Sequence, residues 1–340
     1  MSTTRKNGNT PQGLLRRSAL LLSGAISILA AGPPVRAATT ITFDVPGATY
    51  TEPVAINDNG TITGMFTTPG PSGFVRTADG TITTFRVKGE RATYPMGINR
   101  HGVITGYYLH KRVGHGFVRG RRGRITRFDV PGALYTEPFG IDDAGAVAGQ
   151  YVVSVNVVHG FVRAPDGAVT TFNVSGAAST YVSSMNGNGE IGGWYQMMDG
   201  TADGFLRATD GTITTYNVDG QGATYAAGIS SDGAATGFYN HGSDQSGFVR
   251  WRDGKIATFD VQSAWATEAT AVDGVGTIVG SYYVSGGHEE HAFLRSKTGN
   301  ITTIDVAGEG LTYPVDINNA GVVAGECSDS NGFHGFIRTP

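Results

Sequence analysis

The sequence has few of the features that mark an enzyme. Cys327 is the only cysteine among 340 residues, so no disulfide can form within the chain and its stability must come from packing. No segment matches a G-x-S-x-G nucleophile elbow or a P-loop, and no glycine-rich segment opens a helix, as a dinucleotide-binding fingerprint must. Helical periodicity is also missing. The sequence therefore gives no support for the catalytic machineries that these motifs build.

Long hydrophobic runs are missing too, apart from one stretch near the start. Ala19–Ala31 is apolar and rich in small residues, but it is too short to span a bilayer as a helix. Basic residues precede it and a small-residue cleavage site ends at Ala37. We predict a signal peptide over 1–37 and an exported protein, periplasmic or extracellular, with no membrane span in the mature chain. The pair Arg16-Arg17 leaves the general and twin-arginine export routes both open.

Positive charge is scarce in the mature chain. The leader takes away five of the 25 basic residues and none of the 28 acidic ones. The remainder has 20 basic and 28 acidic residues, a formal net charge of −8. Because nucleic-acid binding depends on an excess of positive charge, we expect no nucleic-acid partner.

Glycine, in contrast, is abundant, with 52 residues among 340, roughly twice the usual share of about 7 %. No G-x-y period is present, which excludes collagen. Aromatic and β-branched residues recur regularly, which argues against disorder. Many glycines between short strands indicate many tight turns.

One hairpin pattern organises the chain, typified by residues 73–87. Asp79-Gly80 predicts a two-residue type I′ turn, and counting outwards from it places Phe74 opposite Phe85. The same counting gives further pairs at Phe117/Phe128, Phe161/Phe172, Phe205/Tyr216, Phe248/Phe259 and Phe293/Ile304.

A second hairpin, typified by residues 54–66, lies between successive copies of the first. Its turn glycine recurs from Gly60 to Gly321, and another glycine follows four residues later each time. Each period of 42 to 45 residues therefore holds four short strands, called A, B, C and D in chain order. Four-stranded units of this length are typical of a β-propeller.

The two ends of the array do not match. The chain begins on an unpartnered D strand, Ile41–Val45, and ends on an unpartnered C strand, Gly335–Arg338. Pairing them would close the ring and hide a sheet edge. We predict an all-β, seven-bladed β-propeller over 38–340 with four-stranded antiparallel blades, the last blade being closed by the N-terminal strand, and we expect a monomer.

The start of strand C carries a short recurring motif. It reads His291-Ala292-Phe293 once, and the other six copies have glycine in the middle. Three of these copies keep the histidine and three replace it, at His115, His159, His334, Ser72, Asp203 and Ser246. Residues 41–340 thereby resemble the HAF-repeat family of exported bacterial proteins. The resemblance implies a repeat type and carries no catalytic residue over to this chain.

The connection from strand D to strand A supplies the main candidate site. One position, seven residues after the valine that closes strand D, recurs in every repeat, and strand A should line the propeller axis. Three carboxylates and four phenols would then surround one mouth of the channel, where they could hold a cation or bind a sugar. The alternative is structural, with tyrosines packed between blades and glutamates capping turns. The positions are Glu52, Tyr94, Glu137, Tyr181, Tyr225, Glu268 and Tyr313.

Histidines offer a weaker candidate. His288 and His291 flank two glutamates and form the densest cluster, a possible metal site. The cluster lacks the helical His-Glu-x-x-His spacing and follows two glycines, so a solvated loop is favoured. The Asx-rich A-to-B turns resemble calcium loops but are too short, and turn stabilisation explains them better.

These observations favour a non-catalytic role. We expect an exported binding or scaffold protein that recognises a saccharide or a protein on the face formed by the D-to-A and B-to-C connections. The first alternative is a metal-assisted lyase or hydrolase at the channel mouth, and the second is a purely structural envelope protein. No cofactor is strongly implied, and a divalent cation is left open.

Overall fold

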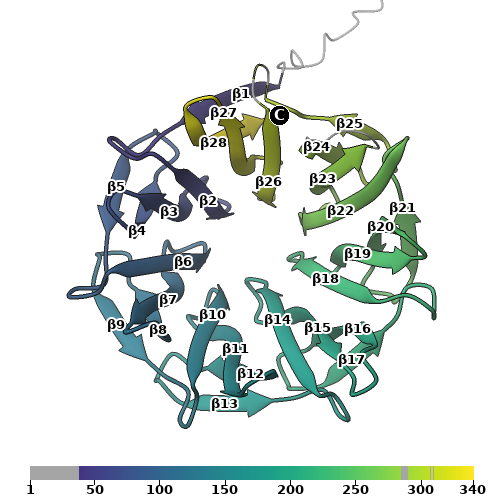
Figure 1. The fold of residues 1–340 in the computed structure, drawn as a ribbon, viewed down its shortest axis with the longest axis horizontal. Helices are drawn as coiled ribbons and strands as arrows, with labels where there is room; N and C mark the ends of the chain where they lie inside the picture. Colours follow the sequence, from purple (N-terminus) through teal and green to yellow (C-terminus); the bar gives the residue numbers. More distant parts are fainter. Residues whose placement is uncertain (1–37, 285–289, 307, 309) are drawn as a thin grey trace, which may run out of the picture. The chain divides into compact units, whose positions relative to one another are not determined.

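The computed structural model describes residues 38–284, 290–306, 308 and 310–340. Ala37–Pro340 form one compact unit. The described residues contain 28 β-strands and no helix, and their sheets are arranged around a central axis (Figure 1). The described part of the chain accordingly has no helix that could cross a membrane. The predicted signal peptide, 1–37, and His288 lie outside the described residues.

The strands fall into four classes by their distance from the axis (Figure 1). The innermost, A, are β2 (Thr51–Ile56), β6 (Ala92–Ile98), β10 (Tyr135–Ile141), β14 (Ser179–Met185), β18 (Thr224–Ile229), β22 (Ala264–Val272) and β26 (Leu311–Ile317). The B strands are β3 (Ile62–Thr67), β7 (Ile104–His110), β11 (Val147–Ser154), β15 (Ile191–Gln196), β19 (Ala235–His241), β23 (Ile278–Val284) and β27 (Val323–Asp329). The C strands are β4 (Pro71–Arg76), β8 (Val113–Arg119), β12 (Val157–Arg163), β16 (Ala202–Arg207), β20 (Asp244–Arg250), β24 (Glu290–Arg295) and β28 (Gly332–Thr339). The outermost, D, are β1 (Thr39–Phe43), β5 (Ile82–Phe85), β9 (Ile125–Phe128), β13 (Val169–Phe172), β17 (Ile213–Tyr216), β21 (Ile256–Phe259) and β25 (Ile301–Thr303).

Consecutive strands pair antiparallel in four-stranded units. Five units are separate sheets, and the β18–β21 and β22–β25 units share one eight-stranded sheet through a single parallel bridge between Gln245 and Ala266. The first strand, β1, pairs antiparallel with β28 from Thr39↔Thr339 to Phe43↔Gly335. The N-terminal and C-terminal strands therefore share one sheet with β26 and β27. The all-β fold of repeated four-stranded antiparallel sheets is as predicted.

The C–D hairpin differs from the prediction by one residue in register. Gly73, not Phe74, lies opposite Phe85. Gly80 has φ 91° while Asp79 does not enter the left-handed region, so the turn is not type I′. The amide of Gly80 donates to the carbonyl of Thr77, and the amide of Thr77 donates to that of Thr81. The connection is therefore a type I turn followed by a glycine in the left-handed region, which is longer than a two-residue turn. The longer connection shifts the pairing of the two strands by one residue.

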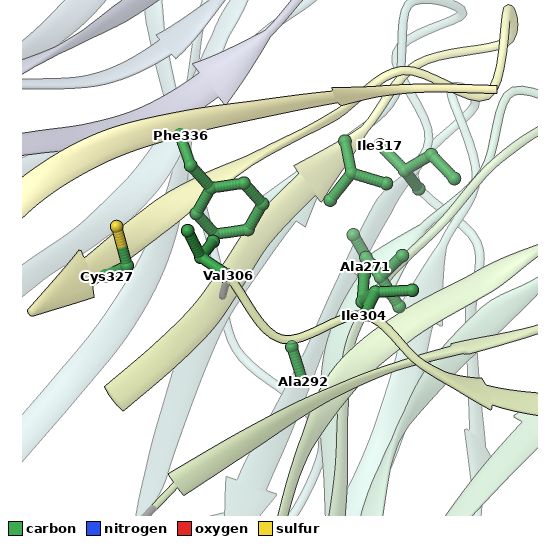
Figure 2. Close-up of a cluster of buried hydrophobic side chains, with 9 residues drawn as sticks. Ala271, Ala292, Ile304, Val306, Ile317, Cys327 and Phe336 are labelled. Carbon is green, nitrogen blue, oxygen red and sulfur yellow. The ribbon is translucent and has the colours of Figure 1, made fainter. Parts of the chain in front are cut away.

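The corrected register explains the glycine that precedes six of the seven C-strand phenylalanines. A Cβ at Gly73 would lie within 3.0 Å of the Phe85 ring, and the same overlap recurs at Gly116, Gly160, Gly204, Gly247 and Gly335. The sixth unit has Ala292 instead, and there the ring is replaced by Ile304. Figure 2 shows Ala292 and Ile304 in one buried cluster with Phe336. The alanine of the His-Ala-Phe motif thus occurs where the ring is missing.

The core lies between neighbouring units. All seven C-strand phenylalanines have no exposed surface, and each of six meets a D-strand ring of the preceding unit edge-on, as Phe117 meets Phe85 at 6.2 Å. The arginine two residues later stacks on the same ring, with the Arg119 guanidinium carbon 4.7 Å from the Phe85 centroid. The repeated arginine is therefore packed on a ring of the neighbouring unit, and in five units it also donates to the carbonyl of the next residue, as Arg76 Nη1 does to Thr77 at 3.4 Å.

Asparagines of the A-to-B turns tie adjacent units together. The Asn57 Oδ1 accepts from two amides of its own turn, and its Nδ2 donates to the carbonyl of Asn99 in the next unit. Asn318 donates in the same way to the carbonyl of Asn57, which joins the last unit to the first. These asparagines therefore stabilise their own turns, as expected, and also join neighbouring units.

Candidate binding site at the channel mouth

A β-bulge in every A strand builds the channel. In β2 the pairing shifts between Pro53 and Ala55, which leaves Val54 unpaired, and an equivalent shift occurs in all seven A strands. The unpaired residues line a cavity of about 210 Å³ on the axis. They are Val54, Met96, Phe139, Ser183, Ala227, Thr270 and Val315.

The seven predicted site residues lie two positions before these bulges, on the side of the D-to-A connections. The structure thus places them at equivalent positions at one end of the channel. We call this end the mouth. The A-to-B turns surround the opposite end, where Asn57 and Asn318 line a second cavity of about 200 Å³.

Seven further side chains complete the mouth, and sequence reasoning missed them. Each lies on a B strand directly opposite one of the predicted residues, as Met65 lies opposite Glu52. The signal was present in the sequence, because each follows the second repeat glycine. The set comprises Met65, Tyr107, Gln150, Trp194, Phe238, Ser281 and Glu326.

Aromatic rings occupy one part of the mouth. Tyr181 stacks on Trp194 with ring centroids 4.0 Å apart, and Trp194 meets Tyr225 edge-on at 5.1 Å. Tyr225 in turn lies 5.1 Å from Phe238. These four rings, which we call the aromatic arc, are all only partly buried. They offer apolar surface with phenol and indole donors at its edges.

A second aromatic pair and one amide–carboxyl contact lie beside the arc. Tyr94 stacks on Tyr107 at 4.8 Å, and burial raises the pKa of Tyr107 to about 12. Between this pair and the arc, Gln150 Nε2 donates to Glu137 Oε2 at 3.0 Å. Glu137 is therefore held by an amide of its own sheet.

Carboxylates gather on the other part of the mouth. Glu326 accepts a 3.2 Å hydrogen bond from the phenol of Tyr50, a residue of the next unit. Burial, reinforced by the charge of Glu52, raises the pKa of Glu326 to about 7. Burial also raises the pKa of Glu52 and of Glu268, the latter helped by the charge of Glu290. We call Glu52, Glu268, Glu290 and Glu326 the acidic arc. Burial favours the neutral form of the carboxyls of Glu52, Glu268 and Glu326.

Tyrosines between these carboxyls remain protonated. Burial and the surrounding carboxylates raise the pKa of Tyr313 to about 12, and burial raises that of Tyr283, which also hydrogen-bonds Glu290. Ser281, opposite Glu268, has no exposed surface, and its Oγ has no hydrogen-bond partner among the described residues. The acidic arc can therefore both donate and accept hydrogen bonds.

One carboxyl lies deeper in the channel. Asp316 lines both axial cavities and accepts hydrogen bonds from the amides of Ile56 and Ile317 at 2.9 and 2.8 Å. Burial raises the pKa of Asp316 to about 7. Since Ile56 belongs to β2 and Asp316 to β26, this side chain also joins the first and last units.

Of the weaker metal candidate, only His291 lies among the described residues. His291 Nδ1 lies 2.8 Å from Asp305 Oδ2, and its ring stacks on Tyr282. His115 makes the corresponding contact with Asp129 at 2.9 Å. Within the described ranges no three His, Cys, Asp or Glu side chains are grouped to hold a metal. His115 and His291 therefore tie strand C to an aspartate just beyond strand D, whereas His159 Nδ1 has no hydrogen-bond partner among the described residues.

Comparison with family models and with curated proteins gave no match. Among solved structures, a streptogramin B lyase has a TM-score of 0.60 and 14 % identity, covering 89 % of this chain and 98 % of that chain. A virginiamycin B lyase from Staphylococcus aureus gives 0.60 and 13 %, covering 89 % and 99 %. The β-propeller domain of the Trilobed protease from Pyrococcus furiosus gives 0.60 and 8 %, covering 86 % and 94 %. The chain has a β-propeller fold. At such identities the likeness extends to the fold alone.

Proposed function

We propose that this chain is an exported, seven-bladed β-propeller whose last blade is closed by its N-terminal strand. The 28 strands, the seven A-strand bulges and the pairing of β1 with β28 support the blade count and the closure. The repeat motif supports membership of the HAF-repeat family. The leader sequence supports export, to the periplasm or beyond the cell.

The function that the geometry supports best is binding of a saccharide at the mouth. The aromatic arc carries this proposal, because partly exposed, stacked rings beside hydrogen-bonding carboxyls and phenols suit the apolar faces and hydroxyls of a sugar. Glu52, Glu268 and Glu326 supply acceptors when ionised and donors when protonated. A protein ligand on the same face is the other form of this binding role.

A thermal-shift scan of residues 38–340 tests the proposal. A ligand that binds only the folded state raises the midpoint by mass action. We expect a shift with one class in a panel of neutral and charged oligosaccharides, and loss of that shift in Trp194→Ala and Tyr225→Ala. Met198→Ala is the matched control, because Met198 is 88 % exposed on a B-to-C connection outside the mouth. Absence of any saccharide response would leave a protein ligand or a structural envelope role.

A metal-assisted lyase or hydrolase is the second candidate. The observation that favours it is Glu326, whose pKa of about 7 suits a general acid or base and whose carboxyl contacts Tyr50. Two similar structures are named as lyases, although the likeness to them is of fold only. Turnover of a polysaccharide that requires a divalent metal and is abolished in Glu326→Gln would favour catalysis over binding. A midpoint that EDTA lowers and one metal restores would point the same way.

A further inference from the structure

Positive charge is concentrated in a single blade. Residues 86–127 contain eleven of the 20 basic residues that follow position 37 and only one acid, Glu90, a formal charge of +10. The rest of the mature chain has nine basic and 27 acidic residues, a formal charge of −18. We call 86–127 the basic segment; it comprises β6–β8, most of β9 and the connection into β6. Its basic residues are Arg86, Lys88, Arg91, Arg100, Lys111, Arg112, Arg119, Arg121, Arg122, Arg124 and Arg127.

These charges face solvent and are mostly not neutralised. All except Arg119 are exposed. Among the described residues, ion pairs hold only Arg100, 3.4 Å from Asp143, and Arg127, 3.2 Å from Glu90. A dense field of one sign on an otherwise acidic protein needs a function, because like charges repel and destabilise the folded state.

The charges reach from one face of the ring to the other. Arg91, Lys111 and Arg112 line a pocket of about 540 Å³ beside the D-to-A connection. On the face of the A-to-B turns, Arg100 and Arg121 line another pocket, of about 480 Å³. Arg127, on the outermost strand β9, lies between the two faces at the rim. The basic residues therefore occupy both faces and the outer strand of one blade, and we call this set the basic stripe.

The tip of this stripe has an unfavourable backbone. Lys111 and Arg112 form the turn between β7 and β8 with φ values of 49° and 71°. Two successive left-handed residues are typical of a type I′ turn, for which Asn-Gly is preferred and long side chains are disfavoured. Two basic residues in this backbone point to a use for their charge, because strain of this kind concentrates at functional sites.

We propose that the basic segment binds an anionic polysaccharide, which crosses the rim from the pocket at Lys111 to the pocket at Arg121. A linear polymer can follow a stripe over an edge, whereas a planar bilayer meets one face at a time. No exposed large hydrophobic side chain lies within residues 86–127, all of which the structure describes, so the apolar anchors of a membrane-binding surface are missing there. This site is separate from the mouth and does not depend on the function proposed for the mouth.

The test measures binding of residues 38–340 to polygalacturonate and dextran sulfate, with neutral dextran as the reference. Lys111→Asn combined with Arg112→Gly removes the tip charge and installs the preferred turn, so its thermal midpoint should be unchanged or higher. Arg121→Ser combined with Arg122→Ser removes charge from the opposite face. Lys255→Gln combined with Lys297→Gln is the matched control, with the same loss of charge elsewhere.

We expect both basic-segment variants to bind the anionic polymers several-fold more weakly, with the slope of log affinity against log salt shallower by about one for each lost contact. The control and Trp194→Ala should bind as the parent does, which separates this result from failure of the mouth proposal. Equal weakening in the control, binding of neutral dextran, or tighter binding to anionic vesicles or duplex DNA than to the polysaccharides would overturn the proposal.

Discussion

The imidazole Nδ1 of His334 lies 3.0 Å from both carboxylate oxygens of Asp44, 290 positions earlier in the chain. The other ring nitrogen, Nε2, lies 3.0 Å from Asp329 Oδ1. Asp44 follows β1 and His334 belongs to β28, so one histidine links the two ends of the polypeptide through side chains. The same pair type within a single blade, His115 with Asp129, does not join chain ends.

Replacing Asp44 by alanine should loosen the N-terminal strand selectively. Because Asp44 is half exposed, the expected loss of stability is small, about 1 kcal/mol or less. We expect faster hydrogen exchange and proteolysis at β1, measured by mass spectrometry. Asp129→Ala is the matched control and should leave β1 protected. Equal protection of β1 in both variants would show that the side-chain link does not hold β1 against β28.

Stability should decrease as pH rises from about 5 to 8. Burial raises the pKa of Glu326 and of Asp316 to about 7, and the hydrogen bond to Asp329 raises that of His334 above 6.5. Each folded-state pKa exceeds the unfolded value, so the contribution to stability is complete below the unfolded pKa and is lost as pH rises through the folded one. Denaturant unfolding at stepped pH measures the slope.

The variant Glu326→Gln should flatten that slope while keeping an acceptor for Tyr50. Asp199→Asn is the control: hydrogen bonds from Thr201 lower the pKa of Asp199, so its contribution is lost only at acid pH, below the range measured. Stability that rises with pH in the parent would contradict the assignment. So would a slope of stability against pH that Glu326→Gln leaves unchanged.

The pairing of glycine with a ring should be measurable as coupling. Gly160→Ala should cost about 1–3 kcal/mol, because a Cβ there overlaps the Phe172 ring. Adding Phe172→Ile should recover part of that cost, since Ala292 and Ile304 coexist in the sixth unit. Denaturant unfolding of the single and double variants gives the coupling energy. If the free-energy costs of Gly160→Ala and Phe172→Ile simply add, the occurrence of Ala292 with Ile304 is unrelated to the overlap between the Cβ and the ring.

Much of the fold could be predicted because every repeat gives the same information. The period, the order of the strands and the β1–β28 pairing follow from glycine and phenylalanine positions alone. The register of the C–D hairpin could not be derived by counting from Asp79-Gly80, because whether one or two residues enter the left-handed region depends on the local backbone. The one-residue shift is what brings Gly73 under Phe85.

The candidate site was predicted only in part, for a related reason. The A-strand positions, such as Glu52 and Tyr225, share spacing and a narrow set of side chains, so they were recognised as equivalent. Their B-strand partners range from Ser281 to Trp194 and share no chemistry, so their common place after the second repeat glycine was not recognised as a site signal until strand pairing placed them opposite the A-strand residues. The raised pKa of Glu326 depends on burial and on Glu52 in the next unit, and repeat spacing contains neither.

The most direct test of the account is the fluorescence of Trp194 during a saccharide titration. Trp251→Phe and Trp265→Phe together leave Trp194 as the only tryptophan. With the saccharide that raises the thermal midpoint most, we predict a saturable change in Trp194 emission whose midpoint equals the Kd from calorimetry, and which Tyr225→Ala abolishes. Calorimetric binding with no change in Trp194 emission would place the ligand elsewhere and contradict the proposed site.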